Sequence, residues 1–447
     1  MLLPARIRQF WQVLLDSLWF IPGLLIFSAM ALGLLLVELE VYYPWQGEQD
    51  YPLIFGAGAD GSRGMLSAIA GSMLTVAGLT FTLTLSAISQ VSSQYSPRLL
   101  RNYMSDRVNQ VVMGYFMGAF AYCLIVLRTI RGSDEIRFVP SIAVVVGLLL
   151  ALGGVMALIF FIHHIAQSMQ VGTIVHDLTQ DTLKTIDRLF PAKLGEPVPH
   201  RARQQQQVDD WLREPAGWTF VRINASGYLQ HIDTDRLLKL ATEHQLLIRL
   251  DYNIGDFVGQ NVPILAFRSS HESSPDRADR ESLTDALQGC VAIGRYRTIK
   301  QDVGFGIQQL VDIILRALSP STNDTTTAVM ALDYLGVVMG ELTRRPFPEP
   351  WRSDGEQLRV ITRSASFETL ARQAFDLVRI NSQGNHALYM RLLDVLASAA
   401  NQTQDTGRRA ELLSQLSAVR QAAAQTLASP YEQELVEQRY RAVRGDA

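Results

Sequence analysis

The sequence predicts a membrane α-helical bundle of four transmembrane helices, followed by a soluble α+β domain with a helical C-terminal part. Up to about residue 167 the chain is dominated by Leu, Ile, Val, Ala, Phe and Gly. That part contains four uncharged or nearly uncharged stretches long enough to cross a hydrocarbon core of about 30 Å. Beyond it, charged residues recur every few positions, as they do in water-soluble proteins.

The four expected spans cover about residues 18–37, 65–91, 109–127 and 139–162. They form a predicted transmembrane domain over residues 1–165. The first span is not expected to be a cleaved signal peptide, because its apolar core is too long and no small-x-small cleavage site follows it. Trp and Tyr residues near the span ends are typical of the headgroup level of a bilayer.

The orientation rests on a small excess of arginine. With a cytoplasmic N-terminus, the inner flanks carry Arg6, Arg8, Arg98, Arg101 and Arg107, and the outer flanks carry Arg63, Arg128, Arg131 and Arg137. Five against four follows the positive-inside rule. An acidic first loop agrees with it (Glu38, Glu40, Glu48, Asp50, Asp60). The expected location is therefore the bacterial inner membrane, with both termini and the soluble domain in the cytoplasm.

The second span carries a stripe of small and hydroxyl-bearing residues. Its members are Ser67, Gly71, Thr75, Gly78, Thr82, Ser86, Ser89 and Ser93. Their steps of 4, 4, 3, 4, 4, 3 and 4 form an eleven-residue repeat, which keeps the stripe on one face of a nearly straight helix. Leu66, Met73, Leu74, Phe81, Leu85 and Ile88 are expected on the opposite side.

Two interpretations of the stripe remain open. Small residues allow close helix packing, and Ser/Thr hydroxyls can bond across such a seam. Alternatively, hydroxyls could line a narrow pore after oligomerisation. Both interpretations describe a surface that does not face lipid, so the stripe alone does not separate them.

Several classes of function are disfavoured. No Asp, Glu, Lys or Arg lies in the middle of a span, where a proton-driven pump usually carries one. The net charge of −3 and the absence of a basic stripe argue against a nucleic-acid partner. Cys123 and Cys290 are expected to be buried thiols. No nucleophile motif, phosphate loop, dinucleotide fingerprint or metal-spaced cluster occurs, so no catalytic residue, cofactor or metal is predicted.

The soluble half is divided into four expected parts: a helix and linker (166–207), a small mixed β/α unit (208–270), a helical hairpin region (271–362) and a C-terminal helical region (363–447). Within the mixed unit, strands are expected at 218–223, 227–231 and 246–252, with Asp233 or Thr234 capping a short helix between the last two. The segment from Gly255 to Leu265 resembles one hairpin of lipoyl-like and barrel-sandwich domains. It lacks their modified Lys, so the resemblance implies a β-hairpin and no cofactor.

A dense polar motif connects two expected helices in the hairpin region. An amphipathic helix runs from Phe305 to Leu318, Ser319-Pro320 stops it, and Asn323 or Asp324 caps the next helix. Turn-and-cap chemistry explains these residues. The alternative is an anion or ligand site near a helix N-terminus, formed by Arg295, Arg297, Lys300, Arg316, Asn323 and Asp324. At the chain end, Ser429-Pro430 is expected to open the last helix, with Ser429 as its cap.

Three motifs carry a resemblance to a known family. They are Val91-Ser-Ser-Gln-Tyr-Ser-Pro97-Arg98, Gly227-Tyr-x-Gln-His231-Ile-Asp233, and the run from Gln301-Asp302-x-x-Phe305-Gly306 to Ser319-Pro320-x-x-Asn323-Asp324-x-x-Thr327-Ala328. With them the chain resembles the bacterial predicted inner-membrane proteins catalogued as domain of unknown function 2254. Thr325 stands where the family has a Pro, at a helix start that both tolerate. The resemblance implies a location but no activity.

Two functions follow from these observations. The first is a homo-oligomeric, channel-like membrane protein with the second span as central seam or pore and a cytoplasmic regulatory domain. The second is a membrane-anchored scaffold or sensor whose cytoplasmic helices bind a soluble partner that the sequence does not identify. The lipid bilayer is a partner in both.

Overall fold

The computed structural model describes residues 14, 17–43, 58–94, 106–133, 136–190, 217–269, 277–347, 351–354, 357–363 and 365–445. The chain divides into two compact units, Phe10–Thr173 and Ile174–Ala447. We call them the membrane unit and the C-terminal unit and describe each by itself. The flanking Arg6, Arg8, Arg98 and Arg101 lie outside the described residues.

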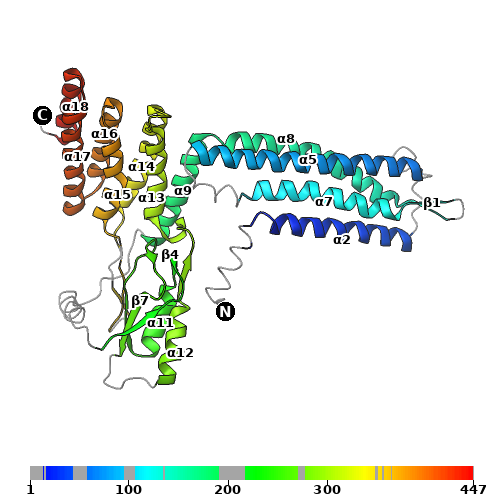
Figure 1. Cartoon of the computed structure of the whole chain (residues 1–447), viewed down its shortest axis with the longest axis horizontal. Helices are drawn as coiled ribbons and strands as arrows, with labels where there is room; N and C mark the ends of the chain where they lie inside the picture. The colour runs from blue at the N-terminus through cyan, green and yellow to red at the C-terminus, as the bar shows by residue number, and fades with distance from the viewer. Residues whose placement is uncertain are drawn as a thin grey trace. The chain divides into compact units, whose positions relative to one another are not determined.

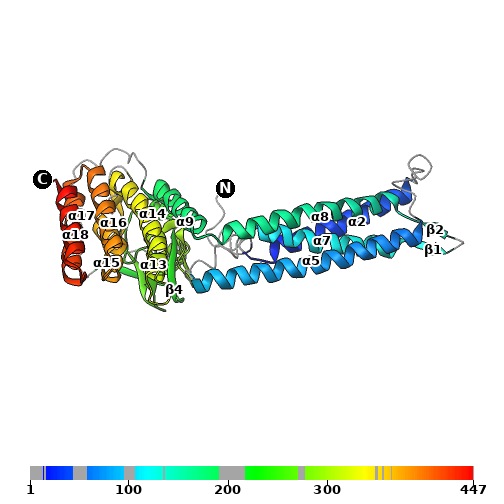
Figure 2. The ribbon, with the colours of Figure 1, turned by 90° about the horizontal axis from the view of Figure 1, so that it is seen from above.

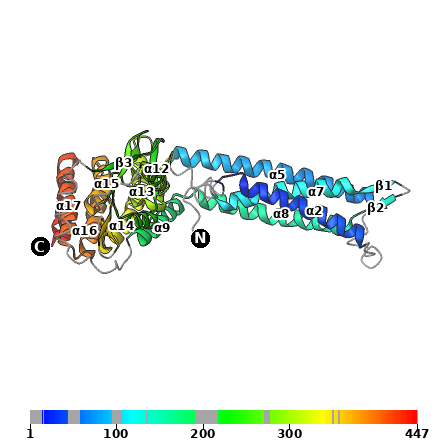
Figure 3. The same cartoon turned by 90° about the horizontal axis from the view of Figure 1, so that it is seen from below.

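The membrane unit consists of long helices that lie side by side (Figures 1 and 3). They are α2 (Phe20–Tyr42), α5 (Ala59–Gln94), α7 (Arg107–Thr129) and α8 (Ser141–Ser168). Each is long and apolar enough to cross a membrane, and in the part of the chain that is described they number four, as predicted. A short antiparallel pair, β1 (Arg131–Ser133) and β2 (Ile136–Phe138), connects α7 to α8.

Contacts at the helix ends fix the directions of the four helices. Glu40 near the end of α2 meets Ile142 at the start of α8, and Arg63 near the start of α5 donates to the Ile130 carbonyl after α7, at 3.0 Å. Consecutive helices therefore run in opposite directions. The chain segments before α2 and after α8 consequently lie at the same end of the bundle.

Helix α7 is the central helix of this unit. Its buried side chains include Phe116, Tyr122 and Cys123, which pack with Leu66 and Met73 of α5. Buried Tyr122 donates its hydroxyl to the Ala143 carbonyl of α8 at 2.8 Å. A buried Tyr usually finds such a partner, because an unpaired phenol is costly away from water. Cys123 is a free, buried thiol, as expected.

The first helix is longer than predicted. It continues past Val37 to Tyr42, so Glu38 and Glu40 lie in the helix, and Asp60 lies in the first turn of α5. The expected acidic loop was wrong for these three residues. Glu40 is almost fully buried, and the reason is its role at the start of α8, described below.

The C-terminal unit begins with most of α9 (Val171–Leu189) and then combines two sheets with helices. The strands are β3 (Thr219–Arg222), β4 (Gly227–Ile232), β5 (Leu246–Leu250), β6 (Phe257–Val258), β7 (Pro263–Ser269), β8 (Val291–Gly294), β9 (Trp351–Ser353) and β10 (Leu358–Ile361). Their orders are β3-β7-β5-β10-β9 and β6-β4-β8. Helices α11 (Thr234–Glu243) and α12 (Arg277–Gln288) share the apolar core of the sheets, through Leu237 and Leu287.

This topology differs from two sequence predictions. The run from Gly255 to Leu265 is not a β-hairpin, because β6 pairs with β4 while β7 pairs with β3 and β5 in the other sheet. Strands β8, β9 and β10 lie beyond residue 270 and complete the two sheets, so the sheets continue across the boundary expected there. Pairing between distant strands leaves no local sequence signal.

The rest of the unit is helical. After a short 3₁₀ turn at Ile299–Gln301, the helices are α13 (Val303–Ala317), α14 (Thr325–Arg344), α15 (Phe367–Asn381), α16 (His386–Gln402), α17 (Thr406–Thr426) and α18 (Pro430–Arg444). Figure 2 shows them as successive neighbours, with α17 and α18 at the C-terminal edge. Pro430 begins the last helix as predicted, but Ser429 makes no side-chain capping bond to it.

Candidate functional site

The predicted stripe forms the outward surface of α5. All eight residues from Ser67 to Ser93 are exposed, and an ideal Cβ at Gly71 or Gly78 would meet nothing within 4 Å. The buried residues of α5 lie on another side of the helix, and five of them follow a stripe residue by two positions. The buried set is Ser62, Leu66, Ile69, Ala70, Met73, Ala77, Thr80, Ala87 and Val91. Two positions correspond to about 200° around a helix, so the stripe points away from the chain's own bundle.

The expected opposite side of α5 is in fact two surfaces. Leu66 and Met73 pack inside the bundle, whereas Leu74, Phe81 and Leu85 are about half exposed. Packing of the stripe against the first, third or fourth span, one form of the packing interpretation, does not occur among the described residues. A partner for the stripe would have to come from outside the chain.

Three hydroxyl groups of the stripe are bonded within their own helix. Thr75 Oγ1 donates to the Gly71 carbonyl, Thr82 Oγ1 to the Gly78 carbonyl and Ser93 Oγ to the Gln90 carbonyl, each at 2.9 Å. Such bonds within one turn are a common local alternative for Ser and Thr in helices. These three hydroxyl hydrogens are therefore satisfied without a neighbour, and their oxygens keep lone pairs that can still accept.

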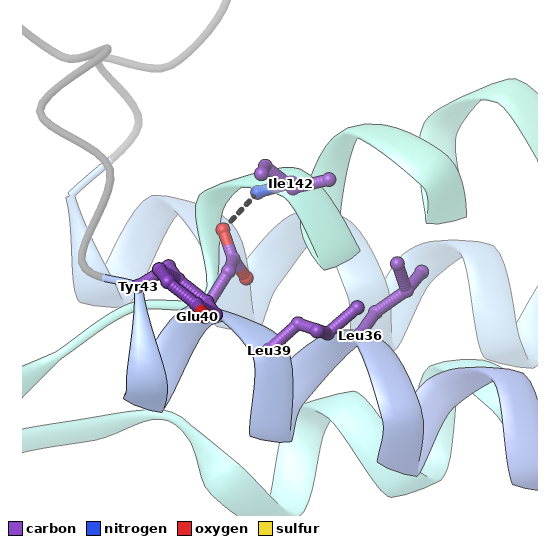
Figure 4. A pocket seen from close by; sticks show the side chains of 5 residues that line it. All are labelled: Leu36, Leu39, Glu40, Tyr43 and Ile142. Carbon is purple, nitrogen blue, oxygen red and sulfur yellow. Dashed lines mark hydrogen bonds between the residues drawn. The ribbon is translucent and has the colours of Figure 1, made fainter.

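Glu40 caps the first turn of α8 from another helix. Its Oε1 accepts from the Ile142 N–H at 2.6 Å and its Oε2 from the Ala143 N–H at 3.4 Å, as Figure 4 shows for the first bond. The residue before α8 is Pro140, which offers no side-chain cap. The first N–H groups of a helix have no partner within it, so a buried carboxylate there stabilises α8.

The same carboxylate borders an open hollow of about 270 Å³. Its lining is otherwise Leu36, Leu39, Tyr43 and Ile142 (Figure 4). Glu40 already accepts two hydrogen bonds from the start of α8, and Tyr43 carries the other polar group of an otherwise apolar lining. We assign it a structural role only.

A second polar group lies at the other end of the bundle. Asp106 Oδ1 accepts from the Val108 N–H and caps α7, while Asp106 Oδ2 lies 2.6 Å from His164 Nε2 on α8. Asn109 and Gln110 in the same turn are buried, and Asn109 Oδ1 accepts no hydrogen bond from the described residues. The sequence offered a signal for Asp106, since Asp directly before an apolar run is a helix-start residue.

The six residues of the predicted anion site are not brought together. Arg295, Arg297 and Lys300 precede α13, whereas Arg316, Asn323 and Asp324 lie at or after its end. A helix of 15 residues is about 22 Å long, which is too far for one small anion. Arg297 is also neutralised, because its guanidinium contacts both Asp302 oxygens at 2.8 and 3.0 Å. The anion-site hypothesis is not supported.

The Ser319-Pro320-x-x-Asn323-Asp324 motif builds a turn and a cap. Asn323 has φ +46°, a left-handed conformation that Asn tolerates better than most residues, and its N–H donates to the Ser319 carbonyl. Asp324 Oδ1 accepts from the Thr327 N–H at 3.0 Å. The Thr327 hydroxyl and N–H hold the pKa of Asp324 below its ordinary value. Of the two predicted caps, Asp324 is the one that α14 uses.

The other motif residues join elements that are distant in sequence. Asp302 caps α13 through the Phe305 N–H, Gln301 Oε1 accepts from the Ile232 N–H of β4, and a side chain at Gly306 would collide with Thr182 of α9. Thr325, where the family has a Pro, opens α14, and its hydroxyl accepts from Asn385 Nδ2 at 2.8 Å. These residues position helices and strands rather than a reacting group.

Reactive or metal-binding groups are not assembled in the described ranges. No group of three or more His, Cys, Asp or Glu residues that could hold a metal occurs in them. The Cys290 thiol lies under the sheet, and burial raises its pKa to about 11, so it is not a nucleophile at neutral pH.

Four antiparallel apolar helices and a mixed C-terminal unit define a multi-pass membrane protein. The family of predicted membrane proteins named domain of unknown function 2254 matches residues 15–398. The chain belongs to this family. It is 31% identical over 437 residues to an uncharacterized protein of Mycobacterium bovis and equally to one of Mycobacterium tuberculosis H37Rv, covering 96% of this chain and 81% of each relative. No solved structure matches the chain.

Proposed function

We propose that the protein is a homo-oligomer of the bacterial inner membrane in which the α5 stripes of several copies meet and form a central seam or a narrow pore. The observation that carries this proposal is the outward direction of the stripe. From Ser67 to Ser93 it extends about 39 Å along the helix, more than the hydrocarbon thickness of about 30 Å. Small residues over such a length allow another helix to approach closely.

The other outward surfaces of the unit support this argument. Helices α2 and α8 expose large apolar side chains, among them Phe27, Leu35, Leu149, Ile159 and Phe160. Those side chains suit contact with lipid tails. The hydroxyl and glycine surface of α5 lets the backbone of a neighbouring helix approach closely, and a second copy of α5 offers the same small residues.

A membrane-anchored scaffold or sensor is the second candidate, and one observation favours it. Because Thr75 and Thr82 bond to their own helix, the middle of the stripe can face lipid with these two hydroxyl hydrogens satisfied. In that case the stripe forms no contact, and the C-terminal helices bind a soluble partner.

Single cysteines decide between these functions. Ser67, Thr75, Thr82 and Ser89 are replaced in turn on a background without Cys123 and Cys290, with Leu74 and Leu85 as matched controls that are exposed on the same helix. A pore gives labelling of Thr75 and Thr82 by charged, membrane-impermeant thiol reagents. A seam gives disulfide cross-links between copies at stripe positions without such labelling. A monomeric mass in nanodiscs, with neither labelling nor cross-linking, would leave the membrane-anchored scaffold or sensor as the remaining function.

The orientation belongs to the same proposal: the C-terminal unit lies in the cytoplasm and regulates the assembly. Reporter fusions after residues 50, 104, 134 and 200 are expected outside, inside, outside and inside. The antiparallel order of the helices requires the fusions at 104 and 200 to agree. If both report the outside, the orientation is reversed while the fold stands.

A further inference from the structure

The three-stranded sheet of the C-terminal unit has one face in the core and one face with exposed aromatic rings. Leu229 and Val258 point into the core. Alternation along the strand places Tyr228 on the other face, where its ring meets Phe257 edge-on at 5.4 Å. Phe257 is 59% exposed. Gly294 lies opposite Tyr228, and the Gln230 side chain lies over it.

A third aromatic residue borders this face. The segment after β8 runs beside β4, because Gln230 Nε2 donates to the Tyr296 carbonyl and Gln301 Oε1 accepts from the Ile232 N–H. Tyr296 is 64% exposed. Exposed rings that gather into one patch, rather than lying singly, are typical of a contact surface.

Three exposed cations lie on neighbouring segments. Arg295 and Lys300 belong to the segment that carries Tyr296, and Arg188 donates to the Lys300 carbonyl, which joins α9 to that segment. None of the three forms an ion pair with any residue that the structure describes. Asp256, beside Phe257, and Asp187, beside Arg188, are exposed carboxylates of the same segments. Asp187 pairs with Arg345, so the three cations still exceed the remaining carboxylate, although the whole chain has a net charge of −3.

We propose that this aromatic–basic face, formed by Tyr228, Phe257, Tyr296, Arg188, Arg295 and Lys300, binds the anionic headgroup surface of the bilayer in which the chain is anchored. Tyr rings favour the headgroup level, and each Lys or Arg near an anionic leaflet adds attraction. The C-terminal unit follows α8 directly through α9, so the tether keeps its concentration at the membrane high. A second copy is the poorer occupant, because two identical basic faces repel each other. The proposal does not depend on oligomerisation.

The test uses the full chain in nanodiscs. An environment-sensitive, ring-bearing fluorophore replaces Tyr296 through a single cysteine, on a background without Cys123 and Cys290. The lipids carry a headgroup quencher and are either phosphatidylcholine alone or a mixture with about one third phosphatidylglycerol. Tyr431 on α18, which is 72% exposed, receives the same label as a matched control.

We expect quenching at Tyr296 that requires phosphatidylglycerol and weakens at high salt, with little change at Tyr431. Replacing Arg188, Arg295 and Lys300 by Gln should weaken the docking equilibrium about fivefold per charge removed. An unchanged melting temperature then shows that the variant is folded. Equal quenching in both lipids, equal quenching in the charge variant, or protection of Tyr296 by cross-linking to another copy would each overturn the proposal.

Discussion

The outward surfaces of α8 and α5 differ in the size of the side chains that they expose. Helix α8 exposes Leu149, Leu152, Met156 and Ile159, and its glycines are turned inward, where an ideal Cβ at Gly147 would lie 2.9 Å from Leu66 Cδ2. Helix α5 turns its glycines outward, where they lie beside half-exposed large residues such as Leu74 and Leu85. On α8 the small residues serve packing within the chain, so on α5 their use must be sought outside it.

The difference between inward and outward small residues can be tested at the glycines of the membrane unit, where we expect substitution to cause the largest loss of stability. An ideal Cβ at Gly114 would lie 2.8 Å from the Pro22 Cα, a backbone atom of α2 that cannot rotate away. Gly114→Leu should therefore destabilise the unit by about 3 kcal/mol. The measurement is denaturant unfolding in detergent at a concentration that keeps the protein monomeric.

Gly71→Leu is the matched control, since its Cβ meets nothing within 4 Å. Its monomer should unfold at the wild-type denaturant concentration. A loss as large as that of Gly114→Leu would show that α5 packs by its stripe inside the chain, which would remove the contrast between the two helices.

Loss of the Glu40 carboxylate, which accepts hydrogen bonds at the start of α8, should cause the next largest loss of stability. Glu40→Ala leaves the buried N–H groups of Ile142 and Ala143 without an acceptor, and we expect a cost of about 2 kcal/mol in the same unfolding assay. Glu40→Gln keeps one acceptor oxygen and should lose less. Equal stability of all three proteins would mean that the start of α8 does not need this cap.

Association between copies should weaken when the outward-facing glycines of α5 are replaced by larger residues. Gly71→Leu combined with Gly78→Leu blocks close approach of helix backbones and should weaken association at least tenfold, which is about 1.4 kcal/mol. Energy transfer between labelled copies, followed during lipid dilution, measures it. Leu152→Ala on α8 changes an exposed lipid-facing residue and should leave association unchanged.

The smallest loss of stability is expected in the C-terminal unit, at Asp324, whose carboxylate bonds to Thr327 of the same chain. Asp324→Asn keeps an acceptor oxygen for the cap and loses the charge at the helix N-terminus, so it should cost about 0.5 kcal/mol at neutral pH. The folded-state pKa of Asp324 lies below its ordinary value, so this stabilisation is present above about pH 4 and is lost as the pH falls through the folded-state pKa. Melting curves of both proteins should therefore converge in acid. A constant difference across pH would assign the loss to something other than the carboxylate.

Local patterns predicted what depends on local physics. The spans, the turn at Ser319-Pro320 and the Asp324 cap follow from hydrophobic length and from turn and capping chemistry, all of which act within a few residues. The sheet pairing did not follow, because β5 pairs in parallel with β10, more than one hundred residues later. Glu40 was assigned to a loop since nothing nearby in the sequence shows that α8 lacks a cap of its own.

For the candidate surfaces too, local features could be predicted from the sequence and long-range ones could not. The spacing of the stripe was readable, but its direction was not, because the packing of α5 on α7 and α8 decides it. The predicted anion site was assembled from residues that are close in sequence, and the length of α13 separates them. The aromatic–basic face was missed because Arg188, Phe257 and Tyr296 come from three distant segments.

The length of α5 has a mechanical consequence. Its 36 residues make a rod of about 54 Å, and even at a tilt of about 40° it spans about 41 Å along the membrane normal. At least one end therefore extends beyond the hydrocarbon core of about 30 Å. Because α5 has buried side chains from Ser62 to Val91, it is held along most of its length, so a displacement of the end near Gln90 would be transmitted along the whole rod and to its outward stripe.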